Sequence, residues 1–257
     1  MRPVSQLMNL SQRKALITGG AGHIGLAVGE TLVELGCDIV ILDQDSEASR
    51  KRALSLSRLR ENNAVGLACD LTDEAATRAA INHSIDKMGG LDILVHCAAY
   101  VGTSQVPGWA VPFEQQTVEA FDAALRVNLT SAFAMVQEAK AALAASGHGS
   151  VIFFGSTYGL VGPDLGLYQD TNMANPAGYG ASKGGLLQLT RYLATILAPE
   201  IRVNAITPGG VWRDQPEQFH QRYVGKTPMG RMATEEDLKG AVAYLASDLS
   251  AYVTGHN

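Results

Sequence analysis

The chain has 257 residues, a net charge of −5 at pH 7 and 46% hydrophobic residues. This length and apolar content suit one well-buried core, and no linker or repeat divides the chain, so we expect a single domain over residues 1–257. The absence of a basic tract argues against a nucleic-acid partner. The sequence has neither an apolar run of membrane-spanning length nor a secretory signal, so we expect a cytoplasmic protein without a membrane partner.

The three cysteines each lie in or beside an apolar segment, at Cys37, Cys69 and Cys97. Buried thiols in a reducing compartment are the plain interpretation of this odd number. A zinc site needs a ligand spacing that the sequence lacks, so we expect no metal.

Short β-rich runs alternate with longer amphipathic stretches, which predicts an α/β fold: one Rossmann-like, doubly wound parallel sheet flanked by helices. The predicted strands are Lys14–Thr18, Asp38–Leu42, Ala64–Cys69, Leu91–His96, Ser150–Gly155 and Ile201–Ile206. The predicted helices are Ile24–Leu35, Ser46–Glu61, Glu74–Met88, Val118–Ser146, Gly178–Ala198 and Glu235–Ser247. We expect the long stretch from Val118 to break near Asn128.

The first predicted strand runs into a glycine-rich turn that opens the first helix. Glycines let the backbone approach a pyrophosphate, and the helix N-terminus offers free N–H groups. A glycine cluster alone is often only a turn, but between a strand and a helix it predicts a dinucleotide site. The residues expected to line this site are Thr18, Gly19, Gly22, His23, Ile24 and Gly25.

Two acidic residues follow the next strands. Asp43 can accept hydrogen bonds from an adenosine ribose and repel a 2′-phosphate, although an ordinary solvated acid is the alternative. No Arg or Lys lies at 19–25 or 44–45 to hold such a phosphate, so we expect NAD rather than NADP. Asp70 can receive the adenine amino group, cap a helix over 71–76, or do both.

Tyr179 and Lys183 are four residues apart on a predicted helix and therefore share a face. The ammonium would favour the phenolate and lower the pKa of Tyr179, which otherwise is a poor base at neutral pH. Such a pair arises often by chance, but here it accompanies a nucleotide-binding turn and Ser156 at the end of a strand. Ligands of parallel sheets bind at these strand ends, so we expect one site there.

The chain resembles the short-chain dehydrogenase/reductase family over nearly its whole length. The resemblance rests on the Thr18–Gly25 turn, Asp70-Leu71, Asn128, Ser156, Tyr179 with Lys183, and Pro208-Gly209, in this order. It implies that Tyr179 transfers a proton, Ser156 orients the substrate oxygen, Lys183 holds the nicotinamide ribose, and Asn128 supports a proton-relaying water. It also implies cofactor contacts at Asp70, Leu71, Cys97, Ala98, Tyr179, Lys183, Pro208, Gly209 and Val211.

Features of two branches of this family are mixed in the sequence. The spacing of Gly19, Gly22 and Gly25 and the segment 95–99 resemble the extended branch, which acts largely on nucleotide sugars. The segment 201–210 and the length are typical of the compact branch, which we expect for the architecture. The long step from Ser156 to Tyr179 carries polar residues that could satisfy substrate hydroxyls, which favours a sugar derivative or nucleotide sugar. A solvated loop without a role in recognition is the alternative.

Further features of the sequence concern the substrate side of the site and the end of the chain. Residues 210–230 are expected to form a substrate loop, or a surface helix with its aromatic side inward. Arg213 stands where the family often has a threonine that meets the nicotinamide carboxamide. Arg126, Arg213, Arg222 and Lys226 could meet a phosphate, or each could be a surface charge. The chain stops at Asn257, where relatives continue into a last strand, which suggests a shortened chain.

The leading hypothesis is therefore an NAD-dependent oxidoreductase that interconverts a hydroxyl and a carbonyl in a small-molecule substrate. One alternative is a redox-neutral nucleotide-sugar epimerase or dehydratase with tightly bound NAD, and another is a non-catalytic NAD-binding scaffold. The stretches 131–145 and 184–197 carry apolar residues on more than one face. We therefore expect a homotetramer or homodimer.

Overall fold

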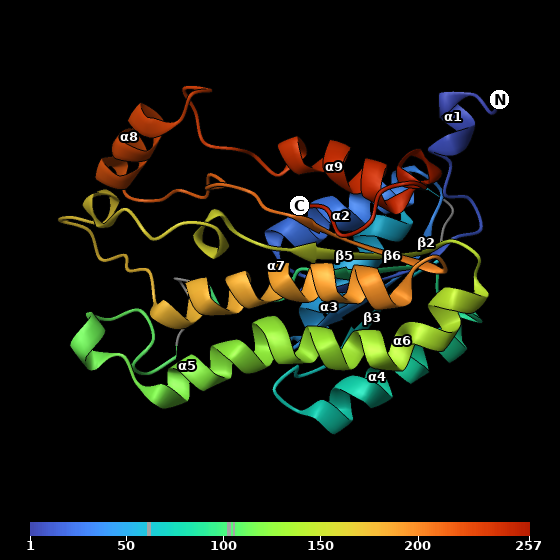
Figure 1. The fold of residues 1–257 in the computed structure, drawn as a ribbon, viewed down its shortest axis with the longest axis horizontal. Helices are drawn as coiled ribbons and strands as arrows, with labels where there is room; N and C mark the ends of the chain where they lie inside the picture. Colours follow the sequence, from blue (N-terminus) through green and yellow to red (C-terminus); the bar gives the residue numbers. More distant parts are fainter. Residues whose placement is uncertain (61–62, 102–103, 105) are drawn as a thin grey trace.

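Six parallel strands form one sheet between two layers of helices in the computed structural model, which describes residues 1–60, 63–101, 104 and 106–257 (Figure 1). The strand order is β3-β2-β1-β4-β5-β6. This is the doubly wound order: successive strands are added on one side of β1 up to β3, and on its other side from β4 onward. The strands are β1 (Lys14–Thr18), β2 (Asp38–Asp43), β3 (Ala64–Ala68), β4 (Ile93–His96), β5 (Gly149–Phe154) and β6 (Ile201–Ile206).

Helices cover both faces of this sheet. Their bounds are α1 (Val4–Leu7), α2 (His23–Glu34), α3 (Ser46–Ser57), α4 (Glu74–Met88), α5 (Val118–Leu125), α6 (Ser131–Ala145), α7 (Ala177–Leu197), α8 (Glu217–Lys226) and α9 (Glu236–Ala246). Buried side chains of α2, α3 and α9 join one core, and those of α4, α6 and α7 join the other. Figure 1 shows α2 and α9 above the sheet and α5, α6 and α7 below it.

Alternate residues of each strand enter opposite cores. In β2, Ile39 and Ile41 belong to the core that includes α2, α3 and α9, whereas Val40 and Leu42 belong to the core that includes α4, α6 and α7. Both sets are almost fully buried. This two-sided burial explains why the strand reads as a continuous apolar run in the sequence. The predicted α/β fold is confirmed, and element ends differ by one to two residues, except that α3 ends at Ser57 and its predicted end at Glu61 lies outside the described residues.

The predicted break near Asn128 takes the form of a change in helix type between α5 and α6. Residues Arg126–Thr130 form a π-helical turn that joins α5 to α6 without interruption. The side chain of Asn128 is fully buried within it, where Oδ1 accepts a hydrogen bond from the Tyr100 N–H at 2.7 Å and Nδ2 donates to Ser182 Oγ at 2.9 Å. A polar side chain inside a helix therefore marks an extra-residue turn here rather than a helix end.

Helix α8 lies within the segment 210–230 that the sequence predicts as a substrate loop. Its Phe219 is buried and contacts the ring of Tyr168, with ring centroids 5.3 Å apart. Figure 1 shows α8 at the end of the molecule beside the segment that leads into α7. Helix α8 is a surface helix that turns its aromatic side inward, and its Phe219 and Tyr223 also line the cavity described below. The role of this segment as a substrate loop stays a prediction.

The last residues of the chain lie along the outer edge of β6. Gly255 N–H donates to the Val203 carbonyl at 2.7 Å, and Ala205 N–H donates to the His256 carbonyl at 2.9 Å. Backbone groups of β6 that a missing strand would leave exposed are therefore paired with this segment. Of the helices in the described ranges, none combines the length and the apolar character needed to cross a membrane.

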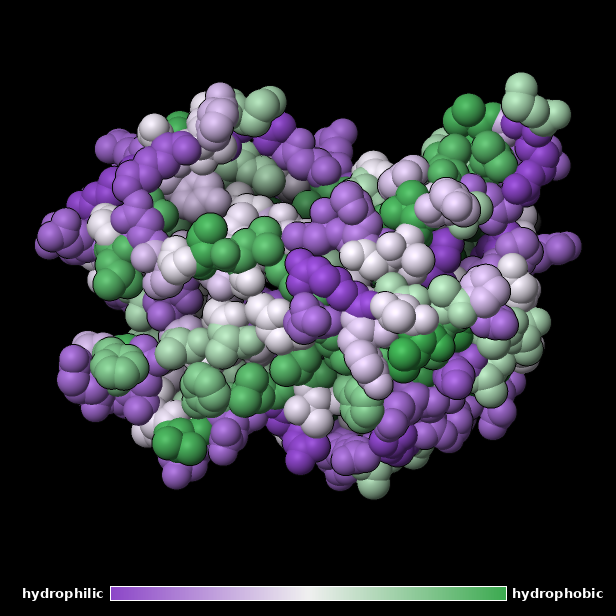
Figure 2. All heavy atoms as spheres, viewed as in Figure 1, coloured by the Kyte–Doolittle hydropathy of each residue, from purple (hydrophilic) through white to green (hydrophobic). Residues whose placement is uncertain are grey.

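Helices α6 and α7 place apolar side chains on more than one face. Met135 and Leu186 are buried against the sheet, whereas Phe133, Tyr192 and Ile196 are exposed. Figure 2 shows hydrophobic side chains gathered in a band over the region of α5 and α6. An exposed apolar surface of this kind is unusual unless something covers it.

Candidate active site

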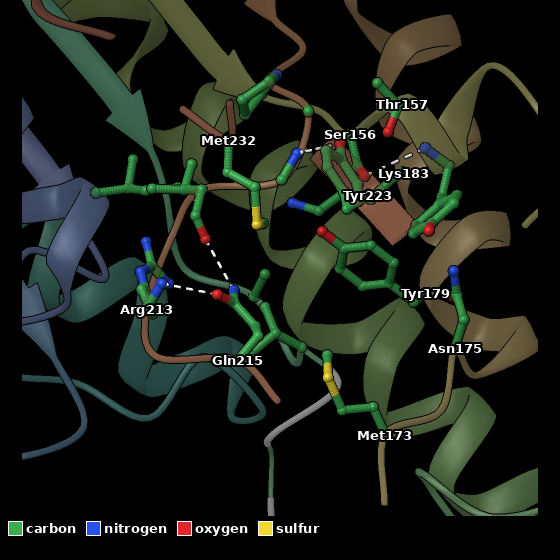
Figure 3. A pocket seen from close by; sticks show the side chains of 18 of the residues that line it. Ser156, Thr157, Met173, Asn175, Tyr179, Lys183, Arg213, Gln215, Tyr223 and Met232 are labelled. Carbon is green, nitrogen blue, oxygen red and sulfur yellow. Dashed lines mark hydrogen bonds between the residues drawn. The ribbon is translucent and has the colours of Figure 1, made fainter. Parts of the chain in front are cut away.

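Residues from several strand ends meet around one cavity, with a volume of about 230 Å³, at the carboxyl edge of the sheet. Parallel strands present their last residues on the same edge, so residues that are far apart in the chain become neighbours. The cavity is lined by Ile24, Cys97, Ser156, Tyr179, Lys183, Pro208, Gly209 and Val211 among the sequence-predicted residues. Figure 3 shows Ser156, Tyr179 and Lys183 close together at this cavity.

Ser156 and Tyr179 meet because the turn after β5 packs tightly against α7. Gly159 lies so close to the helix that a Cβ there would be 2.8 Å from the backbone carbon of Lys183. A side chain at this position would push the turn away from the helix. The Ser156 hydroxyl accepts a hydrogen bond from the Tyr158 N–H at 3.2 Å, which orients it at the start of this turn.

The ionisation of Tyr179 and Lys183 differs from the sequence prediction. Burial raises the pKa of Tyr179, and a hydrogen bond with Ser156 opposes that rise. Burial lowers the pKa of Lys183 to about 8. The Lys183 ammonium donates to the Phe154 carbonyl at 2.7 Å and lies 5.9 Å from the centre of the Tyr179 ring. The net change in the Tyr179 pKa is therefore upward, opposite to the sequence prediction, because burial outweighs the interactions that favour the phenolate.

The glycine-rich turn leaves no room for side chains. Gly19 has a φ of +65°, and a Cβ there would lie 2.7 Å from the Ala98 backbone. A Cβ on Gly25 would lie 2.2 Å from the Gly19 carbonyl oxygen. Helix α2 starts at His23, after Gly22, which provides no side-chain cap, so its first N–H groups are free to bind an anion. This cradle fits the pyrophosphate of a nicotinamide dinucleotide.

The surroundings of Asp43 include a basic residue that the sequence does not reveal. Asp43 Oδ2 accepts a hydrogen bond from the Ala21 N–H at 3.1 Å, which ties β2 to the glycine-rich turn. Arg52 of α3 donates from Nη2 to the Ala21 carbonyl at 3.4 Å. The turn itself contains no Arg or Lys, but α3 folds back and brings the Arg52 guanidinium to the Ala21 carbonyl within it.

Asp70 does not cap the following helix as predicted. It accepts hydrogen bonds from the N–H and the hydroxyl of Thr72, at 2.9 and 2.8 Å. The cap of α4 is Asp73, whose Oδ1 accepts the Ala76 N–H at 2.9 Å. The sequence prediction is three residues early because several acidic and hydroxyl residues precede α4. Leu71 is buried in the core on the α4 side of the sheet.

Thr18 and His96 form a buried pair between β1 and β4. The Thr18 hydroxyl lies 2.8 Å from Nδ1 of His96, and both side chains are fully buried. Burial and the charge of Lys183 lower the pKa of His96 to about 3, so its ring is neutral at physiological pH. This geometry supports a structural role for His96, and it turns the side chain of Thr18 toward β4.

The remaining predicted cofactor residues differ in exposure. His23 has a largely exposed side chain, with Nδ1 3.8 Å from Oε1 of Glu235. Cys97 is half-buried beside the cavity, and burial raises its thiol pKa far above the ordinary value, so the thiol is neutral. Cys37 and Cys69 are buried thiols as predicted. The described part of the chain contains no cluster of three or more His, Cys, Asp or Glu side chains that could hold a metal.

The sequence step between Ser156 and Tyr179 contributes only part of its polar residues to the cavity. Asp164 pairs with Lys226, and Asp170 lies 3.7 Å from Arg222, so these acids fasten the loop to α8. Arg126 instead lies 3.8 Å from Glu74 on α4. Of the four basic residues considered for phosphate binding, Arg213 lines the cavity.

Tyr158, Tyr168 and Asn175 form one wall of the cavity. The sequence did not predict that these three side chains cluster. Tyr168 donates its hydroxyl to the Tyr158 hydroxyl at 2.7 Å, and burial raises the pKa of both. Nδ2 of Asn175 is buried in the same wall beside the hydroxyls of Tyr158 and Tyr168, and it makes no hydrogen bond of ordinary geometry within the described residues. The only sequence signal for this cluster is the unusual length of the step that carries it.

Comparison with known proteins identifies the class that this fold and site define. A family model described as enoyl-(acyl carrier protein) reductase matches residues 19–257. The 4-formylbenzenesulfonate dehydrogenase of Comamonas testosteroni is 33% identical over 258 residues, covering 96% of each chain. The structure is similar to an NAD⁺-bound xylitol dehydrogenase, at 28% identity and a TM-score of 0.83, covering 96% and 97% of the two chains. It is also similar to an NADPH-dependent 3-quinuclidinone reductase from Rhodotorula rubra, at 27% identity and a TM-score of 0.86, covering 100% and 92%.

The chain therefore belongs to the short-chain dehydrogenase/reductase family. It is an oxidoreductase that uses a nicotinamide cofactor and interconverts hydroxyl and carbonyl groups in a small-molecule substrate. Its relatives are named as dehydrogenases and reductases, which does not favour the redox-neutral epimerase or the non-catalytic scaffold.

Proposed function

We propose that this protein is an NAD-dependent dehydrogenase of a small, hydroxylated substrate, a sugar derivative, with Tyr179 as its acid–base group. The observation that carries this proposal is the convergence of Ser156, Tyr179 and Lys183 on one cavity beside the glycine-rich turn. When bound, the nicotinamide supplies hydride transfer. The chain itself supplies the proton transfer and the orientation of the substrate.

The proposed roles follow from the positions of these groups. The Tyr179 oxygen accepts the proton of a substrate hydroxyl during oxidation and returns it during reduction. Ser156 hydrogen-bonds to the same substrate oxygen and holds it within reach of Tyr179. Lys183, buried and bonded to the Phe154 carbonyl, holds the nicotinamide ribose and supplies positive charge beside the phenolate. Asn128 donates to Ser182 Oγ and so holds in place the turn of α7 that carries Lys183. Its support of a proton-relaying water is part of the proposal.

The cofactor is held by the glycine-rich turn and the residues around it. Gly19, Gly22 and Gly25 allow the pyrophosphate to approach the start of α2, with His23 and Ile24 in its first turn. The oxygen of Asp43 that does not bond to Ala21 accepts hydrogen bonds from the ribose. The remaining proposed contacts, at the ends of β1, β3, β4 and β6, are Thr18, Asp70, Leu71, Cys97, Ala98, Pro208, Gly209 and Val211.

We expect the protein to bind NAD at least about tenfold more tightly than NADP, because the Asp43 carboxylate repels a 2′-phosphate. Asp43→Ala should reduce or reverse this preference, since Arg52 beside Ala21 then has no competing acid. A double substitution, Asp43→Ala with Gln44→Arg, should shift it further. Titrations of the purified protein with both cofactors measure the preference, with Asp86→Ala on the surface of α4 as the charge-matched control. Equal or tighter binding of NADP by the unmodified protein contradicts the assignment.

The cavity favours a small substrate over a nucleotide sugar. Its volume of about 230 Å³ lies below the ~300–1,000 Å³ of pockets for drug-sized ligands. The hydroxyls of Tyr158 and Tyr168 and the amide of Asn175 supply polar groups for substrate hydroxyls. The polyol named for the xylitol dehydrogenase and the anionic compound named for the 4-formylbenzenesulfonate dehydrogenase are both small and polar, which supports this substrate class.

We propose that α6 and α7 pair with a second copy of the chain in a dimer or tetramer. The exposed side chains of Phe133, Tyr192 and Ile196 would be covered by this contact. Phe133→Glu combined with Ile196→Glu is therefore expected to yield a monomer by light scattering at micromolar concentration. Leu54→Glu, at an exposed apolar position on α3, serves as the control and should leave the mass unchanged. A monomer mass for the unmodified protein would overturn the proposal.

A further inference from the structure

Arg213 is a cation in the wall of the cavity that the proposed reaction does not use. It lines the same cavity as Ser156 and Tyr179, and its charge acts on the Tyr179 hydroxyl in the direction that lowers the pKa. Figure 3 shows Arg213 beside Gln215, across the cavity from Tyr179. A charged group in the wall of the cavity that holds the reacting hydroxyl can contact another part of the same small substrate.

The backbone around Arg213 is held in a defined conformation. The Arg213 N–H donates to Oε1 of Gln215 at 2.8 Å, and Nε2 of Gln215 donates to the Val211 carbonyl at 2.9 Å. The neighbouring Trp212 N–H donates to the Ala233 carbonyl at 2.8 Å. These contacts fix the turn from which the Arg213 side chain departs, and preorganised donors of this kind bind a ligand at a lower entropic cost.

The guanidinium of Arg213 keeps most of its hydrogen-bonding capacity. Its Nε donates to Oε1 of Glu235 at 3.2 Å. This contact is an ion pair, and the Arg213 side chain is 34% exposed. Across the described ranges, Nη1 and Nη2 donate no hydrogen bond. The two Nη groups form a planar fork that matches the two oxygens of a carboxylate, sulfonate or phosphate.

The described lining of the cavity is rich in donors and contains no acidic side chain. Lys183 and Arg213 are its two cations, and neither Asp nor Glu lines it, although the protein as a whole has a net charge of −5. Nδ2 of Asn175 is a further buried donor, which lies beside the Tyr158 and Tyr168 hydroxyls but makes no hydrogen bond of ordinary geometry in the described residues. Buried donors without acceptors are costly, so a ligand that supplies acceptor oxygens fits this cavity best.

We propose that the substrate carries an oxyanion, a carboxylate, sulfonate or phosphate group, and that Nη1 and Nη2 of Arg213 bind it. The reacting hydroxyl or carbonyl then faces Ser156 and Tyr179. This inference rests on the proposed function, because it assigns the substrate class of the same site. The pyrophosphate of the cofactor has the same chemistry, so the experiment has to separate the two sources of oxyanion.

Matched pairs of alcohols that differ by the anionic group test the proposal by kinetics. Suitable pairs are glucose with glucose 6-phosphate, and cyclohexanol with 4-hydroxycyclohexanecarboxylate. The anionic member should have a kcat/KM at least about tenfold higher, as expected for a charge-assisted, bidentate contact. Arg213→Gln should remove this preference, Arg213→Lys should retain part of it, and Arg58→Gln, at an exposed arginine after α3, should retain all of it. Turnover without a preference for the anionic members, or an equal loss for both members in Arg213→Gln, overturns the proposal.

A binding measurement separates the inference from the proposed reaction. Calorimetry on the NAD-loaded protein compares cyclohexanecarboxylate with its neutral analogue cyclohexanecarboxamide, neither of which can be oxidised at a hydroxyl. Arg213→Gln should weaken the carboxylate at least about tenfold more than the amide, and NAD affinity should change less than the carboxylate affinity. A larger loss of NAD affinity assigns Arg213 to the cofactor and overturns the proposal. Arg213-dependent binding of the carboxylate without NADH formation from any pair supports this inference and contradicts the proposed function.

Discussion

Replacing Tyr179 by phenylalanine is expected to lower turnover about 10²–10⁴-fold, the usual contribution of a positioned proton-transfer group. Only the phenolic oxygen is lost, while the ring keeps its place in the first turn of α7. NAD affinity should therefore stay within about twofold of that of the unmodified protein. Steady-state rates and a cofactor titration of the same preparation measure the two quantities.

Tyr158→Phe is the matched control for this experiment, because Tyr158 lines the same cavity and its hydroxyl is bonded to Tyr168. It should lose less than about tenfold in turnover if Tyr179 alone transfers the proton. The assignment of the proton transfer to Tyr179 is wrong if Tyr179→Phe keeps more than about a tenth of the activity. It is also wrong if Tyr158→Phe loses more activity than Tyr179→Phe.

Lys183→Met is expected to lower turnover and NAD affinity together, each at least about tenfold, because Lys183 is assigned both to the ribose and to the phenolate. The loss should not come from unfolding. The folded-state pKa of about 8 lies below the ordinary value of 10.5, so keeping Lys183 charged costs the folded state free energy at pH 7. That cost disappears as the pH rises from 8 toward 10.5.

The thermal midpoint of Lys183→Met at pH 7 should therefore equal or exceed that of the unmodified protein. Lys140→Met, on the exposed side of α6, is the control for loss of a lysine charge and should retain activity. If Lys183→Met lowers turnover while NAD affinity is unchanged, Lys183 does not hold the ribose, and that part of the assignment fails.

The fold was largely predictable because each strand and helix carries its own local pattern. In β2, alternate residues of a continuous apolar run point into the two cores. A sheet covered on both faces could therefore be expected from Ile39–Leu42 alone. The π-helical turn at Asn128 could not, because it depends on the backbone of Tyr100 and the hydroxyl of Ser182, which are distant in sequence.

In the candidate site, too, the residues with a local sequence pattern could be predicted and those placed by tertiary contacts could not. Ser156, Tyr179 and Lys183 were predictable because a strand end and a helical spacing of four residues are local features. The positions of Arg52 beside Ala21 and of Asp164 and Asp170 against α8 depend on how α3 and α8 fold back on the site. Local composition predicted substrate contacts for those two acids, whereas the tertiary structure uses them to hold the loop.

Net cofactor turnover tests the central claim most directly. The purified protein with NAD is incubated with a panel of polyols, sugars, sugar phosphates, hydroxy acids and nucleotide sugars, and NADH absorbance is followed while the product is identified by NMR. The proposed function predicts one NADH for each carbonyl formed from a small hydroxylated member, and the loss of both in Tyr179→Phe. A product isomeric with its substrate and formed without net NADH, or NADH formation that survives Tyr179→Phe, would contradict it.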